Sequence, residues 1–200
     1  MRVLIAYEFS GVVRRAFRER GHDAWSCDLL PSEDDSEFHI QGDVLNYWNG
    51  RFNVLNCHWD LMIAHPPCTY FASAGLQYLK IQSGRLEKQK ESADFVAELW
   101  QSNIQKICIE NPVGQLPKFI GPYSQIIRMW QFGHSDAQKP TCLWLKGLSK
   151  LNPTNIVLPS PSRRYPNGKV LSVWRSQKGN SKERSRTFQG VAKAMADQWG

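Results

Sequence analysis

Short, wholly apolar runs alternate along this sequence with stretches in which apolar residues recur at helical spacing. A run without polar alternation is typical of a parallel strand buried on both faces, and RVLIAY at residues 2–7 is the first of them. Further strands are expected at 23–28, 38–40, 61–64, 106–110 and 141–145, with helices at 12–20, 85–101 and 190–199. This alternation predicts an α/β fold with a doubly wound, mostly parallel sheet that carries helices on both faces.

The overall composition is that of a globular protein. The chain has 200 residues, of which 42% are hydrophobic and 22% charged, enough for one α/β domain. No apolar run approaches the ~18 residues of a membrane span, and Glu8 interrupts the first run before it reaches the length of a signal-peptide core. The five cysteines have no paired spacing, which argues against a disulfide framework. We therefore expect a cytoplasmic protein that does not associate with membranes.

Basic residues are concentrated in one segment, residues 146–186. This segment holds ten of the 25 Lys and Arg residues but only one of the 18 acidic residues, and so carries a net charge of +9. Such a segment is either a solvated loop or a surface that meets a polyanion, and aromatic rings among its basic residues favour nucleic acid. The candidate nucleic-acid contacts are Arg163, Arg164, Lys169, Trp174, Arg175, Arg184 and Arg186.

Acidic residues follow three successive expected strands. Glu8 comes after the first strand, Asp28 ends the second, and Asp43 follows the third. Ligands of an open parallel sheet bind beyond the carboxyl ends of its strands, where carboxylates can accept hydrogen bonds from ribose hydroxyls and a base. Any one of these acids could instead cap a helix. Together, the three acids predict a site for a nucleoside cofactor.

A Pro66-Pro67-Cys68 turn follows the strand at 61–64. Two prolines fix the backbone and remove two amide donors, so the Cys68 thiol is expected to be presented stiffly at the sheet edge as a nucleophile. Glu110 ends an apolar strand, where burial predicts a raised pKa and a proton-donating role. The other cysteines are expected to be small buried hydrophobic residues: Cys27, Cys57, Cys108 and Cys142.

These residues resemble, in order and rough spacing, the motifs of the DNA cytosine-5 methyltransferases, and in particular the short versions carried by bacteriophages. The segments that carry the resemblance are Phe9-Ser10-Gly11, Asp28, Gly42-Asp43, Pro67-Cys68, Glu110-Asn111 and Phe132-Gly133. Residues 186–192 are similar to the last motif of the family, which folds back onto the cofactor site. The resemblance implies a Rossmann-like fold of the type found in S-adenosylmethionine-dependent methyltransferases.

The resemblance also implies roles for individual residues. S-adenosylmethionine would lie over Phe9, Ser10 and Gly11, beside Pro66, with Asp28 on the ribose and Asp43 on the adenine; these are the candidate cofactor-binding residues. Cys68 would add to C6 of a cytosine in DNA while Glu110 contacts N3 and the amino group, and Lys139 would supply a positive charge. A duplex substrate would have to flip the base out of the stack.

The chain departs from the family pattern at several positions. Val13 stands where the family has a second glycine, and Thr69 where it has glutamine after the nucleophile. Only the 41 residues of the basic segment occupy the place of a separate target-recognition domain. The expected organisation is a catalytic core at 1–145, a basic extension at 146–186 and a returning helix at 187–200. Duplex DNA, single-stranded DNA and a smaller nucleotide all stay open as substrates.

Three other functions compete with this interpretation. Pro66-Pro67 with Tyr70 nearby loosely resembles the motif of amino-methyltransferases, although that motif begins with an acidic residue or Asn where this chain has His65. A catalytically inactive module that binds nucleic acid or a nucleotide is a second alternative. A metal site at Cys57-His58, His65 and Cys68 is disfavoured, because there is no Cys-x-x-Cys pair and a Pro-Pro turn suits tetrahedral ligation poorly. His134 is a further candidate to line the pocket.

Overall fold

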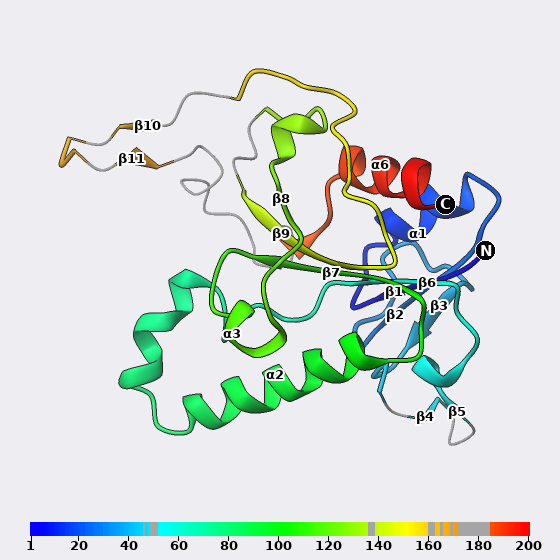
Figure 1. The fold of residues 1–200 in the computed structure, drawn as a ribbon, viewed down its shortest axis with the longest axis horizontal. Coiled ribbons are helices and arrows are strands. Elements are labelled where there is room, and N and C mark those ends of the chain that lie inside the picture. Colours follow the sequence, from blue (N-terminus) through cyan, green and yellow to red (C-terminus); the bar gives the residue numbers. More distant parts are fainter. Residues whose placement is uncertain are drawn as a thin grey trace.

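A seven-stranded sheet forms the centre of the computed structural model (Figure 1). The structure describes residues 1–45, 47–48, 52–135, 139–159, 163–164, 166–168, 170–171 and 185–200. The strand order is β3-β2-β1-β6-β7-β9-β8. The strands are β1 (Arg2–Ala6), β2 (Asp23–Asp28), β3 (His39–Gln41), β6 (Leu61–Ala64), β7 (Lys106–Pro112), β8 (Gln125–Ile127) and β9 (Thr141–Lys146). Only β9 runs against its neighbours in this sheet, β7 and β8, so the sheet is mostly parallel as predicted.

Helices cover both faces of the sheet. The α-helices are α1 (Val12–Arg18), α2 (Arg85–Gln101), α3 (Pro117–Ile120) and α6 (Gln189–Trp199), and the 3₁₀ helices are η1 (Val54–Asn56), η2 (Ser73–Lys80) and η3 (Met129–Gln131). Figure 1 shows α1 and α6 on one side of the sheet and α2 on the other. The predicted doubly wound arrangement is therefore confirmed.

The alternation of side chains along β1 explains why both faces are covered. Val3 and Ile5 pack into the core beneath α1 and α6, whereas Leu4 and Ala6 pack into the core on the side of α2. All four side chains are fully buried. Burying one such large aliphatic side chain is worth about 1.5–3 kcal/mol, so a strand apolar on both faces needs helices on both.

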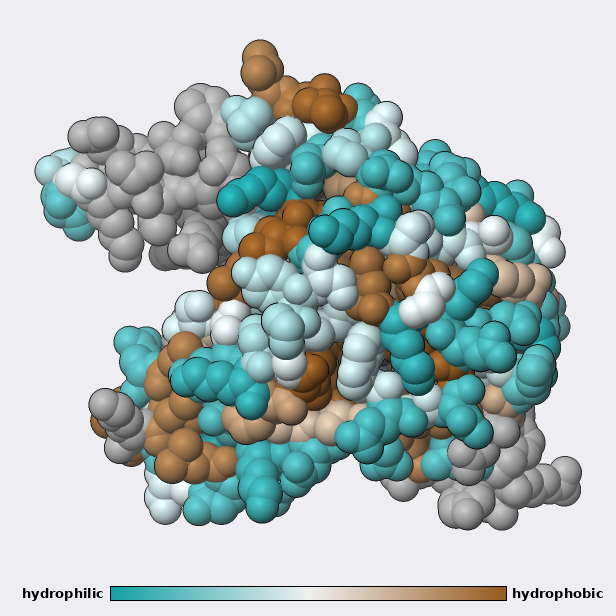
Figure 2. All heavy atoms as spheres, in the orientation of Figure 1, coloured by the Kyte–Doolittle hydropathy of each residue, from teal (hydrophilic) through white to brown (hydrophobic). Residues whose placement is uncertain are grey.

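The C-terminal helix α6 packs against α1. Its Val191, Met195 and Trp199 share a buried cluster with Val13 and Phe17 of α1. The described part of the chain has no helix with the length and apolar character required to cross a bilayer. Large hydrophobic side chains do reach the surface around η2 and the start of α2 (Figure 2), among them Tyr78, Ile81 and Leu86.

Two short strand pairs lie outside the main sheet. One joins β4 (Tyr47–Trp48) to β5 (Phe52–Asn53), and the other joins β10 (Arg163–Arg164) to β11 (Val170–Leu171). The second pair lies in the segment 146–186, for which the sequence predicts a basic extension and no strand. Two-residue strands are too short to produce an alternating pattern, which is why the sequence does not indicate them.

Candidate active site

The turn after β1 is built around the N-terminus of α1. The Glu8 carboxylate accepts hydrogen bonds from the backbone N–H groups of Val13 (2.6 Å) and Arg14 (3.1 Å). Glu8 is 4% exposed, and this burial raises its pKa against the opposing effects of His65 and the two N–H groups. The Glu8 carboxylate thus satisfies the orphan donors of a helix, which is the alternative that the sequence left open for each of the three acids.

Gly11 allows the chain to enter α1 at a tight turn. Its φ is +67°, and a Cβ there would lie 2.4 Å from a guanidinium nitrogen of Arg14, so a side chain would be strained on both counts. Phe9 and Ser10, which precede it, are buried, and the Phe9 carbonyl accepts the N–H of Glu33 (3.0 Å). The three predicted cofactor-binding residues of this turn thus sit at the carboxyl end of β1, with both side chains packed inward.

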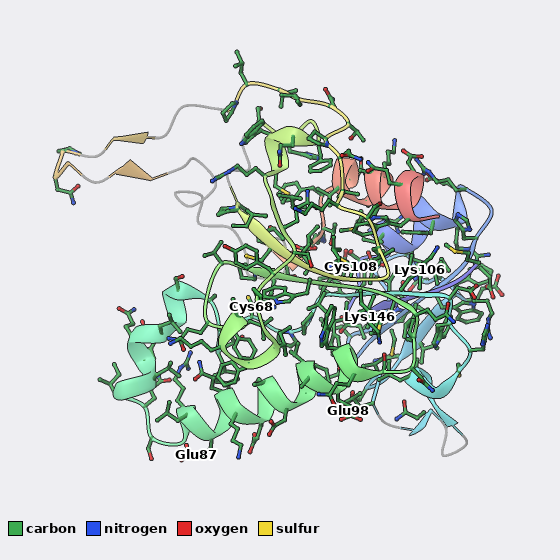
Figure 3. All side chains as sticks on the ribbon, in the orientation of Figure 1. Cys68, Glu87, Glu98, Lys106, Cys108 and Lys146 are labelled. Carbon is green, nitrogen blue, oxygen red and sulfur yellow. The ribbon has the colours of Figure 1, made fainter. Side chains whose placement is uncertain are left out.

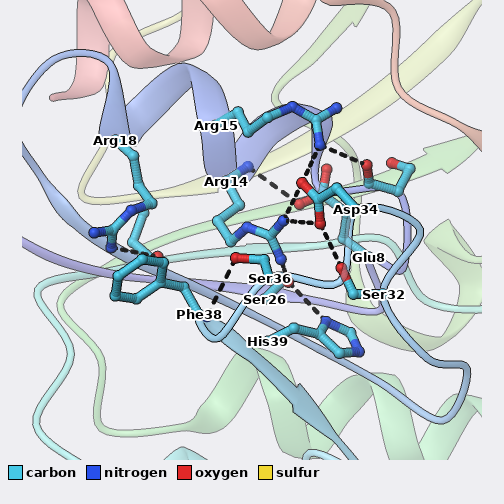
Figure 4. A network of polar contacts seen from close by, with 12 residues as sticks. Glu8, Arg14, Arg15, Arg18, Ser26, Ser32, Asp34, Ser36, Phe38 and His39 are labelled. Carbon is cyan, nitrogen blue, oxygen red and sulfur yellow. Dashed lines mark hydrogen bonds and ion pairs between the residues drawn. The ribbon is translucent and has the colours of Figure 1, made fainter.

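A buried arginine fixes the neighbouring loop (Figure 4). Arg14 is 1% exposed and donates hydrogen bonds to Ser26 (2.8 Å) and to the carboxylate of Asp34, which Arg15 also contacts. Burial by itself would raise the pKa of Asp34, but these arginines hold it well below its usual range. Arg186 pairs with Glu33 of the same loop at 2.8 Å. Arg14 is buried although its neighbour Arg15 is exposed, because Asp34 and Ser26 give the charge of Arg14 hydrogen-bonding partners.

Asp28 and Asp43 lie at the carboxyl ends of β2 and β3, which are neighbours in the sheet. Asp28 accepts the Leu30 N–H (2.9 Å), and burial raises its pKa. One oxygen of Asp43 accepts the Tyr7 hydroxyl (3.3 Å) and the Leu45 N–H (3.0 Å). Burial and Asp43 together raise the pKa of Tyr7, so this hydroxyl stays a donor. Two carboxylates at one edge suit a ligand that presents hydroxyl and amino donors.

The Pro-Pro-Cys turn is anchored from β7. Asn111, which is 1% exposed, donates a hydrogen bond to the Pro66 carbonyl (3.0 Å). The Cys68 carbonyl accepts the N–H groups of Phe71 (3.0 Å) and Ala72 (2.9 Å), which closes the turn. Pro66 is itself buried, whereas the Cys68 side chain is exposed. In Figure 3, Cys68 lies at the end of the sheet opposite Lys106 and Lys146.

Helix α2 and the loop after β7 hold the residues that follow Cys68. Arg85 and Gln89 of α2 donate hydrogen bonds to the carbonyls of Thr69 (3.2 Å) and Tyr70 (2.7 Å). Gly114 lies directly against this turn, because a Cβ there would come within 2.0 Å of the Phe71 carbonyl oxygen. The backbone that follows the exposed Cys68 thiol is therefore held by contacts from α2 and from the loop after β7.

A buried ion pair joins His65 to Glu110. His65 Nδ1 lies 2.9 Å from Glu110 Oε2, and each side chain is 12% exposed. Burial by itself would raise the pKa of Glu110, but adjacent His65 and the charge of Lys139 lower it. The predicted raised pKa and proton-donating state of Glu110 are therefore wrong, since Glu110 is a carboxylate with a cationic partner. The strand register contains the signal for this pair, because β6 and β7 align Ala64 with Ile109, the residues just before His65 and Glu110.

Residues 186–192, which are similar to the last motif of the family, contact the segment at 132–134. The His134 ring lies 4.9 Å from the Phe188 ring, and His134 Nε2 accepts the Gly190 N–H at 3.1 Å. Burial lowers the pKa of His134, which suits its role as an acceptor. A Cβ on Gly190 would lie 1.9 Å from the Phe132 carbonyl oxygen, so the two segments are in direct contact. His134 therefore connects the segment at 132–134 to residues 188–190. The sequence predicts instead that this side chain lines the pocket.

The structure describes only some of the remaining residues that the sequence predicts at the site or in the core. Lys139 is close enough to act on the charges of both His65 and Glu110, and Arg186 is paired with Glu33. Arg163 and Arg164 form β10, but their side chains are not described. The other four lie outside the described residues: Lys169, Trp174, Arg175 and Arg184. Three of the four cysteines expected in the core are buried, and Cys57 is half-buried.

One cavity of the described structure lies at the other edge of the sheet. It has a volume of about 1140 Å³ and is lined by residues from the amino ends of the strands and the end of α2, including Asp60, Glu98 and Lys106. A second cavity of about 570 Å³ lies beside Arg14, Arg15 and Phe38. Neither of these two cavities is lined by Cys68, which is exposed at the carboxyl edge of the sheet. No group of three or more metal-ligating side chains occurs in the described ranges.

Comparisons with known proteins support the architecture. No protein-family model and no curated protein sequence matches this chain. Among solved structures, the Entamoeba histolytica methyltransferase EhMeth is similar with a TM-score of 0.51 and 14% sequence identity, over 78% of this chain and 57% of that one. The chain therefore spans little more than half the length of this neighbour. The strand order and this similarity define a Rossmann-like fold of the methyltransferase type.

The His65–Glu110 pair is expected to make its largest contribution to stability between pH 4.5 and 6.5. The pKa of Glu110 is lowered from 4.5, so its contribution is present above pH 4.5 and is lost as the pH falls through the folded value. The pKa of His65 is raised from 6.5, so its contribution is present below pH 6.5 and is lost as the pH rises through the folded value. Urea unfolding of the wild type and of the double variant His65→Gln/Glu110→Gln across this range measures the difference, and a difference independent of pH would contradict it.

Proposed function

We propose that this protein is an S-adenosylmethionine-dependent methyltransferase that methylates C5 of cytosine in DNA through a covalent adduct with Cys68. The observation that carries the proposal is an exposed cysteine on a doubly anchored turn, three residues after a histidine paired with Glu110. This turn stands at the edge of a methyltransferase-type sheet where Asp28 and Asp43 also lie.

The residues at the ends of β2 and β3 fit the cofactor. The carboxylates of Asp28 and Asp43 are acceptors, and the ribose hydroxyls and adenine amino group of S-adenosylmethionine are donors. Backbone N–H groups and the Tyr7 hydroxyl fix both carboxylates in place. Bound there, S-adenosylmethionine supplies an electrophilic methyl group.

The chain's own residues supply the other steps. The Cys68 thiolate forms a bond to C6 of cytosine, the C5=C6 electron pair shifts to C4=C5, and N3 takes up a proton. Glu110 contacts N3 and the amino group and so stabilises the protonated ring. After methylation at C5, loss of the C5 proton to a base and cleavage of the Cys68–C6 bond restore the aromatic ring.

Release of tritium from cytosine labelled at C5 tests this chemistry. The wild type is expected to release tritium into water from single-stranded or duplex DNA in the presence of S-adenosylmethionine, because the C5 hydrogen leaves only in this reaction. Cys68→Ser should release none. Methyl transfer without tritium release would instead identify an amino-methyltransferase, and cofactor binding without either would identify a binding module.

Asp43→Ala is expected to weaken binding of S-adenosylmethionine by about 1–3 kcal/mol, the cost of leaving a donor of the bound cofactor without its acceptor. Calorimetric titration of the cofactor measures this loss. Asp94→Ala is the matched control, because Asp94 lies on the exposed side of α2 beside the cavity at the opposite edge. If Asp43→Ala and the wild type bind S-adenosylmethionine with equal affinity, Asp43 does not contact the cofactor.

The basic segment is expected to bind DNA in a salt-dependent manner. Neutralising Arg163, Arg164, Arg184 and Arg186 should flatten the slope of log affinity against log salt by about 0.7–0.9 for each lost phosphate contact. Fluorescence anisotropy at several salt concentrations gives this slope. The control for an equal change in net charge replaces four exposed lysines of α2, α3 and α6 by Gln: Lys88, Lys90, Lys118 and Lys193. An unchanged slope in the arginine variant would assign the segment to a solvated loop.

A further inference from the structure

His65 has no part in the reaction as described so far, although it is buried beside the turn that carries the nucleophile. Its backbone N–H donates to the Ala6 carbonyl (2.9 Å), which sets it between the end of β1 and β7. Its Nδ1 is 2.9 Å from Glu110 Oε2, and its Nε2 is buried with no hydrogen-bond partner in the described part of the chain. A proton on Nδ1 therefore has the Glu110 carboxylate as its neighbour and no solvent contact at the other nitrogen.

The charges that face His65 come from several elements. Glu8 follows β1, Asp28 ends β2, Glu110 belongs to β7, and Lys139 precedes β9. Burial lowers the pKa of His65, but Glu110 and Glu8 raise it by more, while Lys139 opposes them. The net result is a raised pKa, so the transferable proton of the pair rests on the imidazole and Glu110 is a carboxylate.

The proposed reaction needs a proton at N3 that a carboxylate cannot give. When Cys68 adds to C6, the electron pair of C4=N3 moves onto N3, which must gain a proton from a nearby group. Glu110 contacts N3 in this scheme but is itself ionised in the free protein. A second group must therefore hold that proton within reach of Glu110.

We propose that His65 is a positioning residue that supplies, through Glu110, the proton taken up at N3 of the cytosine. The inference rests on the proposed function. The proton balance is simple: N3 gains the proton that the imidazolium loses, which leaves a neutral imidazole and a carboxylate that accepts the N3–H hydrogen bond. When Cys68 leaves C6, the proton returns to the pair.

Nuclear magnetic resonance of the free protein tests the resting state without any activity. With ¹⁵N-labelled histidine, the His65 ring is expected to titrate above pH 6.5, and the midpoint should fall in Glu110→Gln, which removes the opposite charge but keeps the side-chain shape. His58, which is exposed at the other edge of the sheet, serves as the internal reference. A midpoint at or below 6.5 in the wild type would overturn the proposal.

The pH profile of adduct formation tests the role in the reaction. The rate of the single-turnover reaction of the wild type with 5-fluorocytosine DNA should fall at high pH as His65 loses its proton. His65→Asn keeps a donor near the position of Nδ1 but carries no transferable proton. In this variant the rate should drop by ~10²–10⁴-fold and the falling limb should move to lower pH, while cofactor affinity is unchanged. His58→Asn is the matched control and should behave like the wild type.

The outcomes separate this inference from the proposed function. A wild type that forms the adduct, together with a His65→Asn variant of equal rate and equal falling limb, would overturn the role of His65 and leave the methyl transfer standing. A wild type that forms no adduct with any DNA, while it binds the cofactor, would overturn both. A lower rate with an unmoved falling limb would assign His65 a purely structural role.

Discussion

Cys68→Ser is expected to abolish the covalent complex that the wild type forms with DNA containing 5-fluorocytosine. Fluorine at C5 blocks the elimination step, which needs a departing proton, so the Cys68–C6 bond persists in the wild type. A serine hydroxyl is a far poorer nucleophile than a thiolate at neutral pH and should form no adduct. Intact-protein mass spectrometry of the reaction measures the adduct, which should also require S-adenosylmethionine.

Two further variants sharpen this result. Glu110→Gln should still bind the cofactor but slow adduct formation by ~10²–10⁴-fold, the usual contribution of a positioned acid–base group. Cys57→Ser is the matched control, because Cys57 is half-buried and lines the cavity at the opposite edge of the sheet. An adduct that survives in Cys68→Ser, or one that disappears in Cys57→Ser, would show that Cys68 is not the nucleophile.

Gly114→Ala is expected to disturb the nucleophile from a distance. A Cβ at this position would lie 2.0 Å from the Phe71 carbonyl oxygen, and backbone cannot move aside as a flexible side chain can. Since the Gln115 N–H holds the same carbonyl at 2.9 Å, the turn carrying Cys68 should separate from the loop after β7. We expect a loss of about 1–3 kcal/mol in the free energy of unfolding, as for other overpacked sites, together with slower adduct formation.

Denaturant unfolding and adduct kinetics of Gly114→Ala measure these two effects. Gly42→Ala is the control for stability, because the space around that Cβ is open within 4 Å and its φ is not in the left-handed region. If Gly114→Ala unfolds like the wild type and forms the adduct at the same rate, the contact between the two loops does not position Cys68.

The sheet could be predicted from the sequence because its central strands are apolar on both faces. The run at 61–64 coincides with β6, and the strand expected at 106–110 lies within β7, which continues to Pro112. The edge strand β8 has only three residues and one buried side chain, Ile127, so it leaves no pattern. The antiparallel direction of β9 depends on pairing with β7 and β8, which composition does not encode.

The sequence predicts which residues lie at the candidate site, but not which charged side chains are buried or how they are protonated. Helical spacing cannot distinguish Arg14 from its exposed neighbours, since its burial depends on Asp34, twenty residues away. The state of Glu110 likewise depends on His65, which is distant in sequence and adjacent only through the register of β6 and β7. A raised pKa is the correct expectation for a lone buried carboxylate, and the partner reverses it.

Methylation at C5 of cytosine can be detected directly by nucleoside mass spectrometry. The wild type is to be incubated with S-adenosylmethionine carrying a labelled methyl group and with single-stranded and duplex DNA, and the products digested to nucleosides. We expect labelled 5-methyldeoxycytidine from at least one of these substrates and none with Cys68→Ser. Labelled N4-methyldeoxycytidine or N6-methyldeoxyadenosine, or no labelled nucleoside from protein that binds the cofactor, would contradict it.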